Sequence, residues 1–132
     1  MNITSPYLST PRGNKYLITF TDYFTEYADV KPIPHQTAKT FARIYETKVL
    51  TLHGIGSRLI TDQGQVFMSP FFRETCKILG TRITRTPSNH PLSNGTIERW
   101  HRSLRAGLSR YENAVHTNCD VLVPFYLMAY RQ

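Results

Sequence analysis

Two acidic residues, Asp62 and Glu98, are separated by 35 residues and lie in contrasting local sequence. Asp62 follows the apolar residues Leu59 and Ile60, which predict a short buried strand, whereas Glu98 opens an arginine-rich segment with helical spacing. Taken singly, an acid after an apolar run is typical of a turn, and a glutamate at a helix start is favoured by the helix dipole. A fold that uses both acids together must bring the end of a strand to the start of a helix.

The segments around Asp62 predict an α/β fold. Residues 1–7, 15–22 and 27–33 are predicted as three consecutive antiparallel strands, because residues 11–14 have turn chemistry and prolines end the third strand. Helices are predicted over residues 37–52, 69–79, 96–113 and 121–130, and further strands over 57–62 and 81–86. A strand that follows a helical crossover runs parallel to an earlier strand, which predicts Asp62 at its carboxyl end. Open α/β sheets place their sites at that edge.

The third predicted helix, residues 96–113, has two different sides. The apolar side is predicted to carry Ile97, Leu104, Leu108 and Tyr111, and the other side Glu98, His101, Arg102 and Arg105. Residues 87–95 hold two prolines, two asparagines, two serines and a glycine, a composition that predicts a mobile loop.

The chain has a formal charge of +7, which favours a polyanionic partner, although an unspecific basic surface would give the same charge. Between residues 82 and 110 there is one acid, Glu98, and there are six arginines: Arg82, Arg85, Arg99, Arg102, Arg105 and Arg110. Arginine suits bidentate contact with phosphate, so this concentration indicates phosphate binding rather than a solvated helix face.

Composition sets the remaining bounds. A chain of 132 residues, 40% of them hydrophobic, is expected to form one globular domain over residues 1–132. Cys76 and Cys119 are too few for a four-ligand zinc site and are expected to be reduced thiols. No apolar run approaches the ~18 residues of a membrane span and no signal sequence is present, so we expect a soluble, intracellular protein without a membrane partner.

The TDQG sequence at Asp62, the interval of 35 residues, the HPLSNG sequence and the Glu98 and Arg99 pair together resemble the catalytic core of retroviral and LTR (Gypsy-type) retrotransposon integrases. The resemblance covers essentially the whole chain, with both ends of the core expected to be cut short. It implies an RNase H-like fold, a five-stranded mixed sheet whose first three strands are antiparallel, with helices on both faces. Members of this family cut donor DNA ends and join them to target DNA.

The resemblance also implies a site and partners. Asp62 and Glu98 match the second and third metal carboxylates of the family, which hold Mg²⁺ or Mn²⁺ through oxygen ligands. The residues that match its DNA contacts are Ser93, Asn94, Gly95, His101, Arg102 and Arg105. DNA as the partner, a homodimer or higher oligomer, and a nuclear location are implied in the same way.

The first catalytic aspartate of the family is missing, because residues 2–7 align with its first strand so that Asn2 stands at the aspartate position. Asparagine offers a carbonyl oxygen but no charge, so the metal ions would lose a negative ligand. Asp22, on the second strand, is the alternative third carboxylate. The loop departs as well, with Leu92 where glutamine and Asn89 where tyrosine are usual.

These observations favour a DNA-binding integrase core, from a retroelement or from a host gene derived from one, whose strand transfer is impaired by Asn2. One alternative is a catalytically dead, domesticated module that binds DNA or a protein. Another is an RNase H-like nuclease acting on RNA hybrids, which the SNG sequence and the 35-residue interval disfavour.

Overall fold

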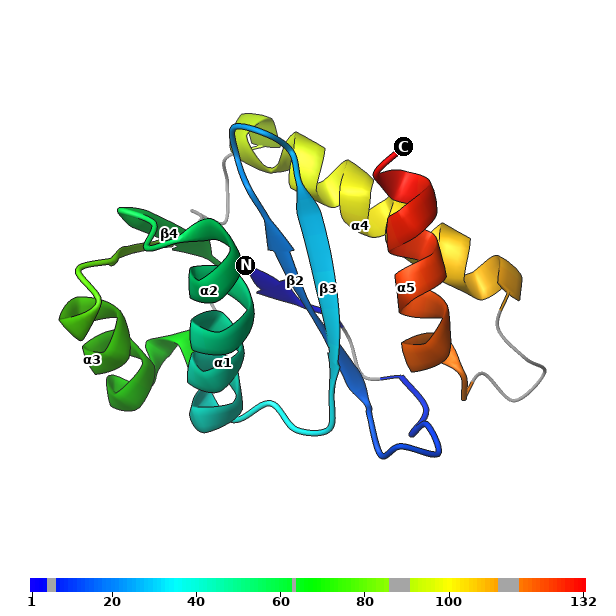
Figure 1. Ribbon diagram of the computed structural model, residues 1–132, viewed down its shortest axis with the longest axis horizontal. Helices are drawn as coiled ribbons and strands as arrows, with labels where there is room; N and C mark the ends of the chain where they lie inside the picture. The colour runs from blue at the N-terminus through cyan, green and yellow to red at the C-terminus, as the bar shows by residue number, and fades with distance from the viewer. Residues whose placement is uncertain (5–6, 63, 86–90, 112–116) are drawn as a thin grey trace.

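The computed structural model describes residues 1–132 except 5–6, 63, 86–90 and 112–116, and for residues 91–97 it describes only the backbone. The strands are β1 (Asn2–Ile3), β2 (Tyr16–Thr21), β3 (Ala28–Ile33), β4 (Arg58–Thr61) and β5 (Arg82–Arg85). The helices are α1 (Ala38–Ile44), η1 (Tyr45–Leu50), α2 (Thr51–His53), η2 (Gln65–Met68), α3 (Pro70–Ile78), α4 (Pro91–Tyr111) and α5 (Cys119–Tyr130). Figure 1 shows their arrangement.

The first three strands form an antiparallel sheet in the order β1-β2-β3, as predicted. In this sheet Asn2 lies opposite Thr19 and, on the other edge of β2, Thr19 lies opposite Val30. The chain turns between β1 and β2 at Gly13, whose N–H donates to the Thr10 carbonyl over 2.8 Å. Gly13 has φ of +79°, a conformation that residues with a side chain rarely adopt. The turn predicted over residues 11–14 is therefore confirmed, with glycine at the position that needs it.

The described residues do not form the expected single five-stranded sheet. Instead β4 and β5 make a separate parallel pair, with Thr61 opposite Arg85, so the parallel partner of β4 comes after it in the chain. The two sheets are linked where the Met1 amino group donates to the Ile60 carbonyl over 2.8 Å.

The predicted starts of the first two helices are confirmed by capping hydrogen bonds. The hydroxyls of Thr37 and Ser69 each accept from the backbone N–H three residues later, over 3.2 Å. From Thr37 the chain forms one continuous helix through α1, η1 and α2, whose middle part is π-helical, and this helix ends at Gly54 with φ of +75°. Gly80, with φ of +71°, follows α3.

Helix α4 is longer than predicted, because it begins at Pro91 and not at Thr96. Proline is favoured in the first turn of a helix, where its preset φ fits and its missing N–H has no intrahelical partner. Ser93, Asn94 and Gly95, which the sequence placed in a loop, therefore lie in the first turns of α4. Residues 86–90 of the predicted loop lie outside the described part of the chain.

Helix α5 begins two residues before its predicted start, and Asp120 anchors it to the turn between β1 and β2. The Asp120 Oδ2 atom accepts from the Thr10 hydroxyl over 2.8 Å and from the Asn14 side-chain amide over 2.9 Å. Burial alone would raise the pKa of Asp120, but these hydrogen bonds outweigh it and hold the pKa below its ordinary value.

Across the ranges that the structure describes, we find no helix with the length and apolar character of a membrane span.

Two apolar cores lie on opposite faces of the antiparallel sheet (Figure 1). One lies between the sheet and helices α1 and α3, and the other between the sheet and helices α4 and α5. The buried residues of the α1–α3 core are Ile18, Phe20, Ile33, Phe41, Ala42, Tyr45, Phe67, Phe72 and Cys76. Those of the α4–α5 core are Leu17, Ala28, Val30, Trp100, Leu104, Leu108, Val123 and Leu127. Successive strand residues point to opposite faces, so neighbours in β2 serve different cores. The expected helices on both faces are therefore present.

Candidate active site

The side chain of Asn2, which the sequence resemblance predicts at the first carboxylate position, is turned towards its own backbone. Its Oδ1 atom accepts a hydrogen bond from the N–H of Ile3 over 2.7 Å. Its backbone carbonyl accepts from the hydroxyl of Thr19 on β2 over 3.1 Å. The residue is therefore fixed in the sheet, and the oxygen that could face a cation already has a donor.

Asp62 lies immediately after β4 and close to the start of β1. The Met1 amino group, which is bound to the Ile60 carbonyl, is buried, and burial lowers its pKa to about 6 although the Asp62 carboxylate raises it. This places Asn2 and Asp62 on neighbouring segments, as the resemblance requires.

The glycine of the TDQG sequence has a physical role at this site. The Oδ1 atom of Asp62 accepts from the N–H of Gly64 over 2.9 Å, which closes a tight turn after the strand. A Cβ atom on Gly64 would lie 2.9 Å from the same Oδ1 atom, closer than real Cβ contacts allow. A side chain at position 64 would therefore push the Asp62 carboxylate away from this position.

His101, on α4, contacts the other side of β2 at the level of Asn2. Its Nε2 atom lies 3.3 Å from the hydroxyl of Thr19, and its side chain is buried, with 9% of the residue exposed. Burial, followed by the positive charges of Arg105 and of the Met1 amino group, lowers the pKa of His101 to about 4. The imidazole is therefore neutral at pH 7 and supports the sheet beneath Asn2.

The remaining predicted residues of α4 are placed differently. Glu98 precedes His101 by three residues, about one helical turn, and is exposed, as are Arg102 and Arg105. The prediction that His101 shares the solvent-facing side with these residues is wrong, because its ring packs against the sheet. Position 101 precedes the buried residues Leu104 and Leu108 by three and seven residues, so it lies on the apolar stripe of the helix.

The described residues do not assemble a metal centre. Within those ranges no group of three aspartate, glutamate, histidine or cysteine side chains converges on one point. A pair of Mg²⁺ ions requires several anionic oxygen ligands. Asp62 supplies one such ligand and the neutral amide of Asn2 supplies none, so these two positions alone do not complete the ligand set.

Asp22, the alternative third carboxylate, is used by the turn between β2 and β3. Its Oδ1 atom accepts from the N–H and the hydroxyl of Thr25, over 2.7 and 2.8 Å, and from the N–H of Phe24 over 3.1 Å. These hydrogen bonds, those from Thr25 first, hold the pKa of Asp22 below its ordinary value. The structure therefore gives Asp22 a turn-capping position.

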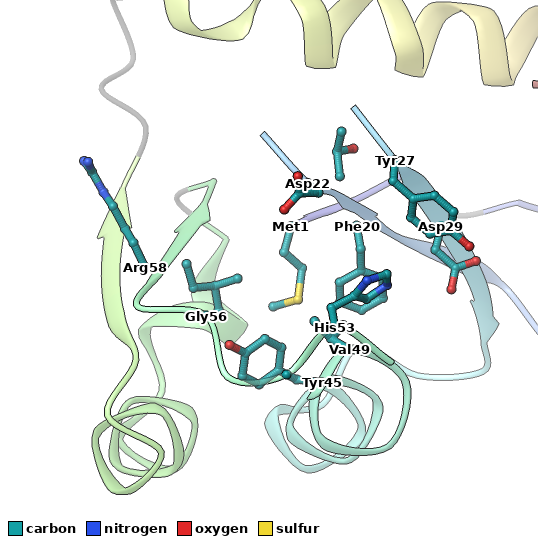
Figure 2. Close-up of a pocket in the computed structure, with 13 residues that line it drawn as sticks. Met1, Phe20, Asp22, Tyr27, Asp29, Tyr45, Val49, His53, Gly56 and Arg58 are labelled. Atoms are coloured by element: carbon teal, nitrogen blue, oxygen red, sulfur yellow. The ribbon is translucent and has the colours of Figure 1, made fainter. Parts of the chain in front are cut away.

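A pocket of about 170 Å³ lies between the antiparallel sheet and β4 (Figure 2). The thioether of Met1 enters it and points towards Tyr45 and Val49 of η1, whereas the side chain of Arg58 points away from it. The pocket occupies the place where the two sheets separate.

Comparison with known sequences identifies relatives among retroelement polyproteins, although no protein-family model matches. The chain is 28% identical over 126 residues to the "Retrovirus-related Pol polyprotein from transposon 412" of Drosophila melanogaster, which covers 95% of the chain and 10% of that protein. It is 32% identical over 98 residues to the Gag-Pol polyprotein of feline leukemia virus (74% and 6%). It is 30% identical over 111 residues to the Pol polyprotein of radiation murine leukemia virus (84% and 19%). The chain thus spans at most 19% of any of these three proteins.

Solved structures with the same fold are retroviral integrases. The catalytic core domain of HTLV-2 integrase, solved in complex with magnesium in a trimeric form, superposes with a TM-score of 0.71 at 18% identity, covering 97% of the chain and 81% of that core. The chain belongs with the retroviral and LTR-retrotransposon integrase catalytic cores. The integrase of a simian T-cell lymphotropic virus intasome, in complex with PP2A regulatory subunit B56 gamma, gives a TM-score of 0.73 at 20% identity, covering 97% of the chain and 46% of that chain.

In this integrase core, the structure brings three of the predicted site residues to the first strand: Asn2 on β1, Asp62 after β4 and His101 behind β2. The structure describes only the backbone of Ser93, Asn94 and Gly95, and the roles of all these residues stay predictions. Sequence reasoning missed Thr19, which joins Asn2 to His101. A threonine inside the apolar run of residues 17–20 was the available signal.

Proposed function

We propose that this integrase core binds DNA and derives from an enzyme that joins DNA ends, with its own metal-dependent chemistry impaired by Asn2. The observation that carries the proposal is the position of Asn2, in register with Thr19 and across Met1 from Asp62. The family places a carboxylate there, and the chain offers an amide that is hydrogen bonded to its own strand. We propose a retroelement, or a host gene derived from one, as its origin.

The DNA-binding part of the proposal is supported by the exposed arginines of α4. Arg102 and Arg105 are exposed, four and seven residues after Glu98 on the same helix. Each phosphate neutralised by a cation contributes about −0.9 to the slope of log affinity against log salt. Arg102→Gln with Arg105→Gln should therefore flatten the slope for duplex DNA by about one to two units. Fluorescence anisotropy at several salt concentrations measures this change.

A matched control removes two exposed cations from α1 and η1, by Arg43→Gln with Lys48→Gln. The control should keep the slope of the unaltered chain. Equal slopes for the two variants and the unaltered chain would mean that the α4 arginines are only a solvated surface. Binding of RNA–DNA hybrids in preference to duplex DNA would favour the nuclease alternative.

The catalytic part of the proposal concerns the charge at position 2. Removing one electrostatic stabiliser of a transition state costs about 10²–10³ in rate in other enzymes. We expect no measurable joining by the unaltered chain, and metal-dependent cleavage of a labelled DNA end by Asn2→Asp in Mg²⁺ or Mn²⁺. Asn2→Ala, which has no charge either, is the control and should stay inactive. Robust joining by the unaltered chain would contradict the proposal.

The alternative is a binding module without catalysis, which the uncharged amide at position 2 would equally allow. In that case Asn2→Asp stays inactive while duplex binding persists. Under either function we propose a dimer or higher oligomer acting in the nucleus, where DNA is available. Light scattering measures the first property and fluorescence microscopy of the tagged protein the second.

A further inference from the structure

The pocket between the antiparallel sheet and β4 has an apolar interior (Figure 2). Its volume of about 170 Å³ is close to that of an engineered protein cavity of about 150 Å³ that binds benzene. The interior is formed by side chains that are buried or half-buried: Met1, Phe20, Tyr45, Val49 and Leu59. An apolar space of this size suits a ligand body of about one aromatic ring.

The helix that forms one wall of the pocket has an irregular geometry at this point. Tyr45 and Val49 belong to its π-helical part, and Tyr45, Val49 and His53, spaced by four residues, all line the pocket. Segments of π-helix are rare and are frequently found at functional sites. The irregular part of the helix therefore coincides with the pocket wall.

Asp22 supplies a negative charge at the mouth of the pocket. Its hydrogen bonds from Thr25 and Phe24 all reach Oδ1 and fix the side chain, which leaves Oδ2 to accept from a ligand. Asp22 is exposed, and within the described ranges it forms no ion pair. A fixed carboxylate without a counter-ion is a strong acceptor for an ammonium group.

Two other charged residues that line the pocket already have partners. Asp29 forms ion pairs with Lys31 over 3.0 Å and with Arg131 over 3.2 Å. The side chain of Arg58 points away from the pocket (Figure 2), and its Nε atom donates to the Thr84 hydroxyl over 2.9 Å. Asp22 is therefore the carboxylate of the lining that can accept a new cation.

We propose that this pocket binds a small organic cation, in which a primary ammonium group is joined to an apolar body of about one aromatic ring. The body packs against Phe20 and Val49, and the ammonium group donates to the Oδ2 atom of Asp22. The rings of Tyr27 and His53, with centroids 5.3 Å apart, complete the mouth. This inference goes beyond the proposed function, because it involves no DNA.

Met1 connects the pocket to the candidate site. Its thioether lies in the pocket, and its amino group donates to the carbonyl of Ile60, two residues before Asp62. A methionine side chain is flexible and adapts to irregular spaces, so the thioether can pack against a ligand while the backbone of β1 stays in place. The methyl group of Met1 is therefore a probe for an occupied pocket.

The first test varies the charge of the ligand at nearly constant shape. Titration calorimetry compares 2-phenylethylamine, 2-phenylethanol and phenylacetate, which share the benzene ring and a short side chain but are cationic, neutral and anionic. The amine should bind saturably and about fivefold more tightly than the alcohol, and phenylacetate should bind most weakly. Equal affinity for the three compounds would overturn the proposal.

The second test separates the mouth from the interior. Asp22→Asn keeps an Oδ1 acceptor for the turn but removes the charge, so it should weaken the amine by about fivefold and leave the alcohol unchanged. Glu26→Gln, on the same hairpin but outside the pocket lining, should change neither. Val49→Phe fills the interior and should abolish binding of both compounds, whereas Val121→Phe, at an exposed position of α5, should not.

A third measurement locates the ligand by NMR of methionine methyl groups labelled with carbon-13. The chain has three methionines, Met1, Met68 and Met128, whose signals are assigned with Met68→Leu and Met128→Leu. The amine should shift the Met1 signal and leave the other two in place.

Absence of saturable binding, or binding that leaves the Met1 signal unchanged, would overturn the proposal. If Val49→Phe does not fold, the effect of Asp22→Asn on the amine still decides the outcome. An amine affinity that Asp22→Asn does not change would disprove the ammonium contact and with it the proposed ligand class. Duplex binding by the unaltered chain is measured separately, so a failure of the proposed function leaves this result standing.

Discussion

The imidazole of His101 links stability to pH at the scale of a single residue. Its pKa in the folded chain is about 4, against an ordinary value of 6.5, because the ring is buried and lies near positive charges. As the pH falls below 6.5, His101 becomes protonated in the unfolded chain but stays neutral in the folded chain. The stabilisation from the neutral ring is therefore complete above about pH 6.5 and is lost as the pH falls towards about 4.

We expect His101→Gln to remove this dependence, because glutamine can still contact the Thr19 hydroxyl but does not titrate. The unaltered chain should lose up to about 3 kcal/mol of unfolding free energy between pH 7 and pH 4 through this residue. Urea unfolding at several pH values measures the difference between the two chains. Parallel pH curves for His101→Gln and the unaltered chain would contradict the burial argument.

At the scale of elements, Gly107 allows α4 and α5 to pack closely against each other. A Cβ atom on Gly107 would lie 2.6 Å from the Cδ2 atom of Tyr126, whose hydroxyl is held by Ser103 over 3.1 Å. Alanine in a helix is normally better than glycine by about 0.5–1 kcal/mol. Overpacking costs about 1–3 kcal/mol, which is larger, so Gly107→Ala should destabilise the chain despite its better helix propensity.

The sign of this effect should reverse when the ring is absent. In a chain with Tyr126→Ala, Gly107→Ala should raise the unfolding free energy by about 0.5–1 kcal/mol, because only helix propensity then acts. Chemical unfolding of the two single variants and the double variant completes the cycle. The same sign in both backgrounds would show that Tyr126 does not set the distance between the helices.

The elements that sequence predicted well depend on contacts within a few residues. Thr37, Ser69, Gly54 and Gly80 begin or follow helices through hydrogen bonds or φ values confined to one turn, and these signals are readable in order along the chain. The early start of α4 at Pro91 was missed because the same residues also suit a loop.

Features that depend on distant parts of the chain were predicted less well. Strand β4 pairs with β5 and not with an earlier strand. Strand pairing depends on which N–H and C=O groups meet in the folded chain, and the sequence of β4 alone does not indicate its partner. In the candidate site, the approach of Asn2 to Asp62 followed from the family resemblance. The amide of Asn2 turned to the Ile3 N–H, and the Met1 amino group at Ile60, are details of packing that no spacing predicts.

At the scale of the whole molecule, the antiparallel sheet separates two cores that share strands but not side chains. Substitutions in residues without shared contacts add in free energy within about 0.5 kcal/mol. Phe72→Leu in the α1–α3 core and Val123→Ala in the α4–α5 core should each cost about 0.5–3 kcal/mol and should add. Urea unfolding of the single and double variants tests this.

A contrasting pair lies within one core. The rings of Phe67 and Phe72 are 5.7 Å apart, edge to face, so Phe67→Leu with Phe72→Leu should deviate from additivity by about 0.5 kcal/mol or more. Coupling of that size across the sheet, between Phe72 and Val123, would show that the sheet transmits packing changes.

The position of the sheet between two cores also bears on how such a chain changes over generations. A substitution accepted in the layer of α1 and α3 imposes no repacking on the layer of α4 and α5. Each layer can therefore accumulate substitutions independently of the other. The layer of α1 and α3 can exchange its surface chemistry while the layer beneath Asn2 and His101 keeps its own. A descendant that no longer joins DNA could in this way acquire a new partner on one side and retain the ancestral one on the other.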